Sequence, residues 1–314
     1  MKKARVYRSS AREFECRDIE TGEMLFATAL GNLLKKDNSI VVGDIVNLDD
    51  EGVITSIEER SSEIYRYLPR VQKKKITAAN CDLLIILNSV SKPEYKRGFA
   101  DRFLLRASQW GIKPVMIFNK MDQFEDQFDF NFEVDRLKEL GVECFEISAK
   151  FPETEKKYLD RGTEELKEFI KGRTAIFLGQ SGVGKSKTIS LLAGMDIELK
   201  TKEIGKAGKG SHTTTWSEII DCGDFSLIDS PGIRSFSLED LVGEELMELF
   251  PDLEERAVNC KFSDCQHSSG TKGCAFHKPL LDPDSYEGQL VHSRLESYLR
   301  VYEEITENPA WSKK

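Results

Sequence analysis

A glycine-rich segment near the middle of the chain has the composition of a phosphate-binding loop. Residues 179–186 satisfy the pattern G-x-x-x-x-G-K-[ST], with an apolar run before them and a helical pattern after them. Glycines let backbone N–H groups curve around phosphates, Lys185 adds a cation near the β- and γ-phosphates, and the Ser186 hydroxyl is a ligand that Mg²⁺ accepts. We predict that the nucleotide phosphates are bound by Gly179, Gln180, Ser181, Gly182, Val183, Gly184, Lys185, Ser186 and Lys187.

Two further motifs have the residues needed to recognise a guanine base. Asn119-Lys120-Met121-Asp122 closes the apolar run 114–118 and fits the pattern N-K-x-D. The Asp122 carboxylate can accept two hydrogen bonds from the guanine N1–H and N2 amino group, a pair of donors that adenine lacks. Ser148, Ala149 and Lys150 end the next predicted strand and offer a backbone N–H for guanine O6. Each motif is weak alone, but a single β–α unit separates them, and together they predict binding of GTP.

The segments after the phosphate loop carry residue types that bind Mg²⁺ and sense a γ-phosphate. Residues 229–232 fit D-x-x-G, in which Asp229 holds Mg²⁺ through water and the Gly232 N–H meets the γ-phosphate. Residues 208–215 read Gly-Lys-Gly-Ser-His-Thr-Thr-Thr, and one threonine would complete the Mg²⁺ coordination. Thr214 is favoured for this role, with Thr213 and Thr215 as alternatives.

The residue after the D-x-x-G motif bears on hydrolysis. Many GTPases place there a glutamine that orients the attacking water, and this chain has Ile233. Another group, the substrate phosphate or a partner must then act. His212 is a titratable candidate, although a histidine that only contacts backbone is an equally good interpretation. We predict slow intrinsic hydrolysis that a partner raises, with a catalytic set of Lys185, Ser186, His212, Thr214, Asp229 and Gly232.

Three cysteines and a histidine lie within fifteen residues near the C-terminal end. The spacing is Cys260-x₄-Cys265-x-His267-x₆-Cys274, and three thiolates with one imidazole make a closed tetrahedral Zn²⁺ site. A site without an open position predicts a structural zinc that stabilises a segment poor in apolar residues. His277 is a possible substitute for His267, and a loop with unligated cysteines is the alternative interpretation.

The elements that position these motifs alternate between strand and helix patterns. Apolar runs at 83–87, 114–118, 142–147 and 175–178 predict buried parallel strands, and helical patterns fall at 98–110, 131–140 and 163–171. A strand pair at 219–220 and 225–228 follows. This alternation predicts a doubly wound α/β domain. A helical pattern at 285–305 predicts a mainly helical segment around the cysteines.

The N-terminal part has short alternating runs typical of a small β-barrel. Strands are expected near 6–7, 24–27, 40–42 and 53–57, and residues 41–62 predict a hairpin. Basic residues are frequent between positions 60 and 75, and tyrosines lie among them. These cations are compatible with RNA phosphates or with a charged linker. We therefore expect a β-barrel over 1–70, an α/β domain over 71–238 and a zinc-binding helical domain over 239–314.

Composition limits the location and the kind of protein. The 314 residues carry a net charge of −9, and no apolar run is long enough to span a bilayer or to act as a secretory signal. Seven cysteines, four of them isolated, do not form a disulfide framework. We expect a cytoplasmic monomer with no membrane partner.

The order of the motifs differs from that of an ordinary GTPase. Here N-K-x-D and S-A-K precede the phosphate loop, the threonine loop and D-x-x-G. This order, with a barrel in front and a Cys/His cluster behind, resembles the circularly permuted GTPases of the ribosome small-subunit-dependent GTPase A family (RsgA, YjeQ or YloQ) over nearly the whole chain. Two departures are Ser211, where the family has arginine in R-G-R-H-T-T-T, and Ser230, where it has threonine.

The resemblance implies a fold, an activity and partners. The expected fold is an OB-fold barrel, a circularly permuted P-loop GTPase domain and a helical zinc domain. The expected activity is Mg²⁺-dependent hydrolysis of GTP to GDP, stimulated by the 30S ribosomal subunit during its late maturation, with 16S rRNA contacts. Two other hypotheses remain: a GTP-regulated module acting on another RNA such as tRNA or in membrane traffic, and a zinc-stabilised RNA-binding protein with a degenerate nucleotide site.

Overall fold

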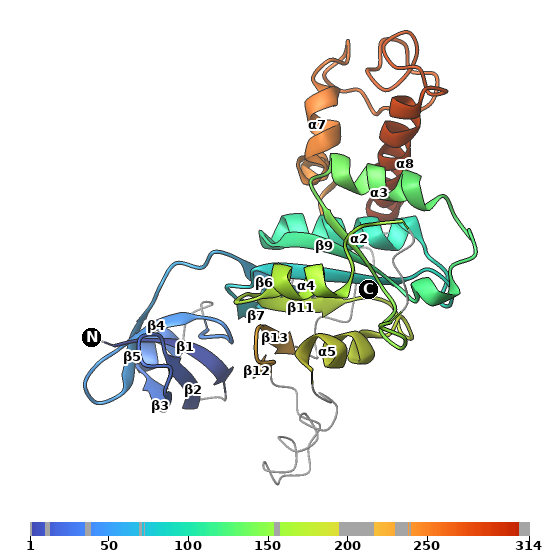
Figure 1. Cartoon of the computed structure of the whole chain (residues 1–314). Helices are drawn as coiled ribbons and strands as arrows, with labels where there is room; N and C mark the ends of the chain where they lie inside the picture. Colours follow the sequence, from blue (N-terminus) through green and yellow to red (C-terminus); the bar gives the residue numbers. More distant parts are fainter. Residues whose placement is uncertain are drawn as a thin grey trace.

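The computed structural model describes residues 2–9, 13–34, 39–68, 71, 73–153, 158–194, 217–229, 238 and 240–307 (Figure 1). Five strands form a barrel at the N-terminal end: β1 Lys2–Ser9, β2 Glu13–Asp18, β3 Met24–Ala29, β4 Ile45–Leu48 and β5 Val53–Ile57. Their order is β1-β2-β3-β5-β4, and β1 also pairs with β4 to close the barrel. Helix α1, Gly31–Leu34, connects β3 to β4, so the barrel has the five-stranded Greek-key connectivity of an OB-fold.

The barrel core follows from alternation along these strands. In β2, Phe14 and Cys16 point inward while Glu13, Glu15 and Arg17 point outward. The inward residues form one apolar cluster with those of the other four strands. The predicted hairpin over 41–62 is confirmed as the antiparallel pair β4–β5.

The expected strand at 40–42 is wrong. Val42 makes only an isolated bridge to Ala78, and the strand lies at Ile45–Leu48. Gly43 has a φ of +91°, and a Cβ there would come within 1.9 Å of the Ala79 carbonyl oxygen. Gly43 thus brings the backbone against the chain that leads into the next domain, and this close approach ends the extended segment.

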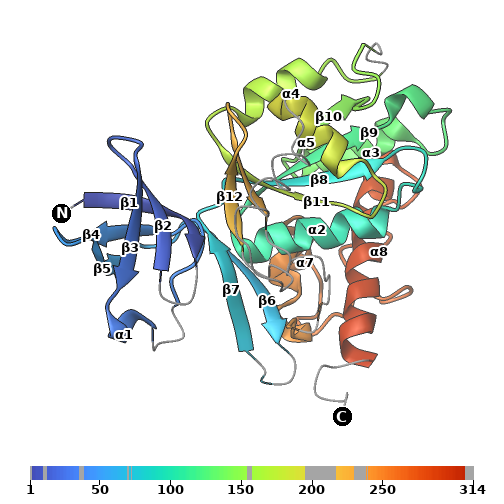
Figure 2. The same ribbon diagram turned by 90° about the horizontal axis from the view of Figure 1, so that it is seen from below.

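A two-stranded hairpin that the sequence did not indicate follows the barrel. Strands β6, Glu63–Leu68, and β7, Lys73–Ala79, form a separate antiparallel sheet. The hairpin projects away from the main sheet between the barrel and the C-terminal helices (Figure 2). Its base is anchored by buried Ile64 and Ala78, while the basic residues of its two strands, Arg66 and Lys73 to Lys75, are exposed.

The central sheet carries the strands that end in the nucleotide motifs. Its order is β10-β9-β8-β11-β13-β12, with the first five strands parallel and β12 antiparallel. The strands are β8 Leu83–Ser89, β9 Lys113–Asn119, β10 Glu143–Ile147, β11 Thr174–Leu178, β12 Glu218–Asp221 and β13 Ser226–Asp229. Every residue of β8 and β11 is buried, as a sheet covered on both faces requires.

Helices cover both faces of this sheet. Helices α2, Arg97–Trp110, and α3, Phe130–Glu139, pack on one face, and α4, Thr163–Ile170, and α5, Lys185–Ala193, pack on the other (Figures 1 and 2). Residues of β8 alternate between the two cores, with Leu84 and Ile86 on the α2 side and Leu83, Ile85 and Leu87 on the α5 side. The predicted doubly wound α/β domain is therefore correct.

The barrel is joined to the central sheet by arginines. Arg8 of β1 lies opposite Glu218 of β12 and its Nη2 is 2.6 Å from the Glu218 carboxylate. Arg5 donates to Thr174 Oγ1 and to the Asn80 carbonyl, each at 2.7 Å. Arg17 pairs with Asp221 at 3.2 Å. Three barrel arginines thus form contacts inside the protein that hold the barrel against the central sheet.

The C-terminal part packs on the helical face of the α/β domain. It contains the 3₁₀ turns η4, Gly243–Glu245, and η5, Met247–Leu249, then α7, Pro251–Ala257, and α8, Tyr286–Glu307. Its core includes Leu246, Phe250, Phe276 and Leu295 and reaches Leu105 of α2. The helix expected at 285–305 is confirmed. No helix in the described part of the chain is long and apolar enough to cross a membrane.

A buried ion network joins the α/β domain to the C-terminal part. Asp101 of α2 is 3% exposed and accepts hydrogen bonds from Arg136 at 2.7 Å, from Arg294 of α8 at 2.9 Å and from Ser297. Arg294 also pairs with Asp252 at 3.1 Å. Two guanidinium groups from different domains therefore share one carboxylate, which fixes α8 against α2.

Candidate nucleotide site and metal centre

The predicted nucleotide motifs meet at one edge of the central sheet. Asn119 ends β9, Ser148 follows β10, Gly179 follows β11 and Asp229 ends β13. These four strands are parallel within the sheet, so their carboxyl ends share one edge, where α/β folds bind ligands. Segments far apart in the sequence therefore contribute to one surface.

Asn119 is the centre of this edge. Its side chain is 2% exposed, and Nδ2 donates to the carbonyl oxygen of Val183 in the phosphate loop at 2.8 Å. Its Oδ1 accepts from the backbone N–H of Ala149 at 3.0 Å and from that of Lys120 at 2.8 Å. One amide thus connects the N-K-x-D, S-A-K and phosphate-loop segments.

The rest of the base-reading segment is held by the same neighbours. Lys120 has a φ of +68°, and its Nζ donates to the carbonyl oxygens of Gly182, at 2.8 Å, and Lys92. The Asp122 backbone N–H donates to Ser148 Oγ at 3.0 Å. Asp122 is half-buried, and its Oδ2 lies 3.3 Å from Gln123 Nε2. Met121 is buried beneath this turn.

Two glycines let the phosphate loop pack against these segments. Gly184 has a φ of +101°, and a Cβ there would lie 2.4 Å from Asn119 Nδ2. A Cβ at Gly179 would lie 2.3 Å from the Leu87 carbonyl oxygen of β8. Larger residues at either position would push the loop away from the base-reading segment. The glycines are thus needed for close approach within the protein.

The charged side of the phosphate loop is formed by the start of α5. Lys185 Nζ donates to the carbonyl oxygens of Gly179 and Gln180 at 2.7 and 2.8 Å, which places the ammonium inside the curve of the loop. The side chains of Ser181, Ser186 and Lys187 are exposed around it. The N-terminal N–H groups of α5 and this ammonium together favour an anion.

Several predicted residues lie outside the described part of the chain. They are His212, Thr213, Thr214, Thr215, Ser230, Gly232 and Ile233. Asp229 is described and ends β13 beside β11, one strand from the phosphate loop. The predictions for the γ-phosphate and for the catalytic group therefore remain predictions.

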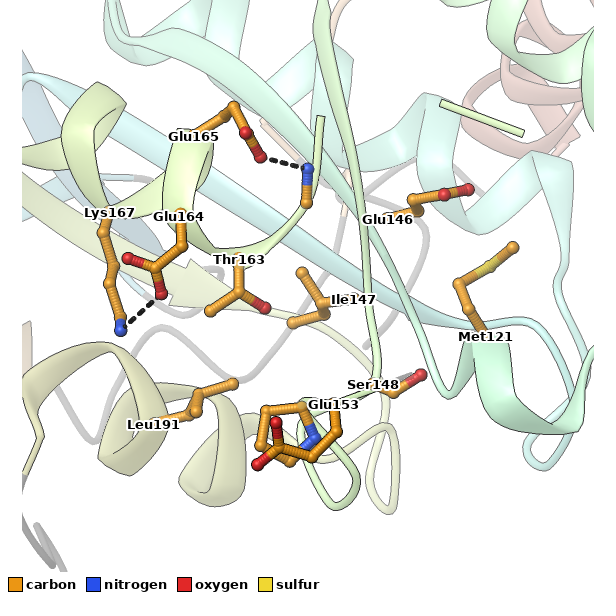
Figure 3. Close-up of a pocket in the computed structure, with 12 residues that line it drawn as sticks. Met121, Glu146, Ile147, Ser148, Glu153, Thr163, Glu164, Glu165, Lys167 and Leu191 are labelled. Carbon is orange, nitrogen blue, oxygen red and sulfur yellow. Dashed lines mark hydrogen bonds and ion pairs between the residues drawn. The ribbon is translucent and has the colours of Figure 1, made fainter. Parts of the chain in front are cut away.

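A cavity of about 480 Å³ adjoins the base-reading segments (Figure 3). Met121 and Ser148 line it on one side, and Leu191 of α5 and Thr163 of α4 line the other. Glu164 and Glu165 at the cavity are held by Lys167 and by the Gly162 N–H, respectively. Four glutamates line the cavity against one lysine, so it does not suit phosphate groups: Glu146, Glu153, Glu164 and Glu165, with Lys167.

The predicted metal ligands also come together. The Sγ atoms of Cys260, Cys265 and Cys274 and a ring nitrogen of His267 all lie within 4.8 Å of one another. His267 Nδ1 is 3.6 Å from Cys260 Sγ and 3.7 Å from Cys274 Sγ. A tetrahedral zinc with its usual bond lengths separates its ligand atoms by about 3.5–3.8 Å, so this cluster fits the ion.

The surroundings of the cluster suit a cation. Burial, together with the neighbouring thiols of Cys260 and Cys265, raises the pKa of the Cys274 thiol to about 12. Burial lowers the pKa of His267, which favours the neutral imidazole that metals bind. Three thiolates in such a buried place need a positive ion beside them.

His277, the possible substitute ligand, has another role. Its Nε2 lies 3.2 and 3.1 Å from the carbonyl oxygens of His267 and Ser268, and only a donor can bond to two carbonyls. This contact supports His267, whose φ is +56°. The preference for His267 over His277 agrees with the geometry.

The sequence does not indicate a second buried ion pair, which Asp240 forms with Arg106. Asp240 accepts from the Arg106 guanidinium of α2 at 2.7 and 2.8 Å and from the Tyr65 hydroxyl at 3.2 Å. These contacts fix Asp240, which follows the D-x-x-G motif in the sequence, to α2 and β6. The two charges are 134 residues apart, and in the sequence each looks like an ordinary exposed charge.

The chain matches a known protein family over its central part. The model of the RsgA GTPase family matches residues 57–239, which is more than half of the chain. This range contains every nucleotide motif described above.

Named relatives resemble the chain over most of its length. The small ribosomal subunit biogenesis GTPase RsgA of Bacteroides fragilis is 34% identical over 301 residues, which cover 92% of each chain. That of Flavobacterium psychrophilum is 35% identical over 282 residues, which cover 86% of this chain and 82% of the relative.

Solved structures show the same fold. YjeQ from Thermotoga maritima matches with a TM-score of 0.70 and 26% identity, covering 98% of this chain and 99% of that one. YloQ, described as a circularly permuted GTPase, matches with a TM-score of 0.67 at 22% identity, covering 97% and 95%. The permuted order of the motifs is thus built on a known arrangement of strands.

Proposed function

Because the chain belongs to the RsgA GTPase family, we propose that this GTP hydrolase acts in the assembly of the small ribosomal subunit, which it binds directly. Its relatives are named as small ribosomal subunit biogenesis GTPases. The proposal includes Mg²⁺ dependence, hydrolysis stimulated by the 30S subunit and contact with 16S rRNA. We also propose that the protein is a cytoplasmic monomer.

The structural observation that carries the GTP-binding part of the proposal is the position of Asn119. Its amide bonds to Val183, Ala149 and Lys120, so the base-reading and phosphate-binding segments are fixed relative to each other. A guanine nucleotide has its base and phosphates at a set distance, and only a site with both parts in register can select it. In the proposed complex, Asp122 accepts from guanine N1–H and N2, and Lys185 meets the phosphates.

In the proposal, hydrolysis takes place at the γ-phosphate end of the site, opposite the end that binds the base. Ser186 and Asp229 supply oxygen atoms for Mg²⁺, which binds oxygen ligands and would neutralise charge on the phosphates. Thr214 would complete the coordination of the ion, the Gly232 N–H would contact the γ-phosphate, and His212 would act on the attacking water. With Ile233 in place of a glutamine, intrinsic turnover is slow and the ribosomal subunit raises it.

The surface that suits RNA is the β6–β7 hairpin. Arg66 lies directly opposite Lys75 across its two strands, and both are exposed. Like charges facing each other destabilise a strand pair, so this pair favours a bound polyanion. Exposed Lys73 and Lys74 extend the patch, and Lys74 Nζ lies 4.7 Å from the Tyr65 ring centre. The barrel arginines, in contrast, contact the central sheet.

The zinc site is assigned a structural role. Four protein ligands leave no position for a substrate, and the ion would stabilise the loops between α7 and α8. Cys260 and Cys265 pack against the C-terminal core, and Cys274 belongs to it. Zinc binding therefore supports the domain that Asp101 and Arg294 hold against α2.

The test is GTP turnover with and without purified small ribosomal subunits. We expect slow phosphate release by the protein alone and a large increase when subunits are added. Lys185→Ala should abolish both rates, which excludes a contaminating hydrolase. Cosedimentation with subunits in a non-hydrolysable GTP analogue, but not with tRNA, is the second expected result. Turnover that subunits leave unchanged would argue against a ribosomal role.

A further inference from the structure

The outer face of the barrel carries an apolar patch formed by Ile19, Met24 and Phe26. Their exposed fractions are 52%, 55% and 80%. Met24 and Phe26 point to the same side of β3, and Ile19 follows β2 at the adjoining turn. Isolated exposed apolar residues are ordinary on a protein surface, but three on one hairpin, including a nearly fully exposed phenylalanine, indicate a binding surface.

The patch lies beside a strand that is only partly paired. Strand β5 is registered against Thr28 and Ala29 of β3, and within the described residues no strand is registered against Met24–Ala27 on that side. Such an edge can accept the backbone of an added extended segment. Side chains of that segment would then contact Phe26 and Met24 on the outer face.

The exposed charges in the two turns beside the patch are acidic, while exposed Lys2 and Lys3 of β1 lie on the Ile19 side, where the Ile19 N–H donates to the Lys3 carbonyl oxygen. Glu20 and Glu23 lie exposed in the β2–β3 turn, and Asp50 and Glu51 lie exposed in the β4–β5 turn. The second turn is close to Phe26, because an added Cβ at Gly52 would lie 3.7 Å from the Phe26 carbonyl oxygen. The nearby Arg17 guanidinium is engaged by the Gly22 carbonyl at 2.9 Å and by Asp221.

From these observations we infer that the outer face of β2–β3 docks an extended, lysine- and arginine-rich polypeptide segment belonging to the assembly that the protein binds. An acidic rim repels RNA phosphates and attracts lysine and arginine, while an aromatic anchor at the centre suits apolar side chains of a peptide. The basic β6–β7 hairpin would then bind RNA, and the acidic barrel face would bind protein. This inference rests on the proposed ribosomal function.

Photo-crosslinking identifies the occupant. The full-length variant Phe26→p-benzoylphenylalanine is first bound to purified small ribosomal subunits in the presence of a non-hydrolysable GTP analogue. The complex is then irradiated. We expect an adduct to a basic segment of a ribosomal protein, identified by peptide sequencing. Ser56→p-benzoylphenylalanine, at an exposed position on β5, is the control and should give no such adduct. An adduct to 16S rRNA, or none while the protein still cosediments, would overturn the inference.

Charge reversal gives an independent test. Glu23→Lys should weaken subunit binding about tenfold if the occupant is basic, whereas an RNA occupant would bind this variant more tightly. Phe26→Ser should also weaken binding about tenfold, and Phe26→Tyr should retain it. Unchanged binding by Phe26→Ser, or tighter binding by Glu23→Lys, contradicts the inference. GTP turnover without subunits should stay the same in all three variants. Failure of the unaltered protein to cosediment would count instead against the proposed function.

Discussion

Asn119 Nδ2 and the carbonyl oxygen of Val183 are joined by a buried hydrogen bond of 2.8 Å that links two motifs 64 residues apart. In an ordinary GTPase order the phosphate loop precedes the base-reading motif, and here it follows. The contact does not depend on the order of the motifs in the chain, because β9 and β11, which lie on either side of β8, end at the same edge of the sheet. A permuted chain can therefore build the same site.

Asn119→Ala should weaken GTP binding without unfolding the protein. The change leaves the Val183 carbonyl and two backbone N–H groups without their partner, and each loss costs about 1 kcal/mol, so affinity should fall about 100-fold. Titration with a fluorescent GTP analogue measures the effect. Asn47→Ala removes a barrel amide that also makes two side-chain hydrogen bonds and should leave affinity unchanged. Equal affinities of the two variants would show that Asn119 does not order the site.

The positions of most strands and helices in the α/β domain could be predicted from the sequence. Buried parallel strands need continuous apolar runs, and Leu83–Ser89 has one, buried throughout. The glycine-rich loop at 179–186 and the Cys/His cluster were equally visible, because each is a set of particular residue types at short spacing. Buried strands and short-spaced motifs can therefore both be recognised from residues that are close together in the sequence.

Features that depend on tertiary contacts could not be predicted. The β6–β7 hairpin contains a run of three lysines without apolar alternation, and it pairs because Ile64 and Ala78 are buried at its base. Asp101 and Arg294 are 193 residues apart, and neither differs in sequence from an exposed charge. The strand lies at Ile45–Leu48 and not at 40–42, because Gly43 approaches Ala79, a residue in another element.

Asp122→Asn should change base selectivity. The asparagine amide cannot accept from both guanine N1–H and N2, but it can pair with xanthine, which has an oxygen at position 2. The carboxylate accepts hydrogen bonds from two donors of guanine, so its loss should weaken GTP binding about 100-fold. Binding of XTP should improve. Competition between the two nucleotides measures the shift. A preference for GTP over XTP that stays unchanged would show that Asp122 does not read the base.

Cys260→Ser should lower the zinc content and loosen the C-terminal domain. The thiolate is one of four ligands, and a hydroxyl is a poor replacement for it. We expect less than one zinc per chain by atomic absorption and an earlier thermal transition, while GTP binding is retained. Cys222→Ser, at a buried cysteine outside the cluster, should keep a full zinc content. A full zinc content in the Cys260→Ser protein would exclude this cysteine as a ligand.

Asp101→Asn should destabilise the contact between α2 and α8. The change leaves the Arg136 and Arg294 guanidiniums buried without their shared carboxylate, which costs about 3–5 kcal/mol. Thermal unfolding should show an earlier first transition. Asp284→Asn removes an exposed pair with Lys278 and should change stability by less than about 1 kcal/mol.

The same carboxylate gives a pH dependence with a defined sign. Burial alone would raise the pKa of Asp101, but Arg136 and Arg294 outweigh it, and the pKa is lowered from 3.8. A folded-state pKa below the unfolded value means that the stabilisation is complete above about pH 4 and is lost as the pH falls further. Urea midpoints between pH 5 and pH 2.5 should fall more steeply for the unaltered protein than for Asp101→Asn. Parallel curves would contradict this role.

Arg66→Ala and Lys75→Ala should weaken binding to the small ribosomal subunit and reduce its dependence on salt. Each residue is proposed to neutralise a phosphate, so each change should lower the slope of log affinity against log salt concentration by about 1. Without RNA, removing either charge relieves a like-charge pair across β6 and β7, so the isolated protein should be no less stable. Lys171→Ala, an exposed cation beyond α4, is the matched control and should leave the slope unchanged. A slope that is equal in all three variants would show that phosphate contacts lie elsewhere than on the hairpin.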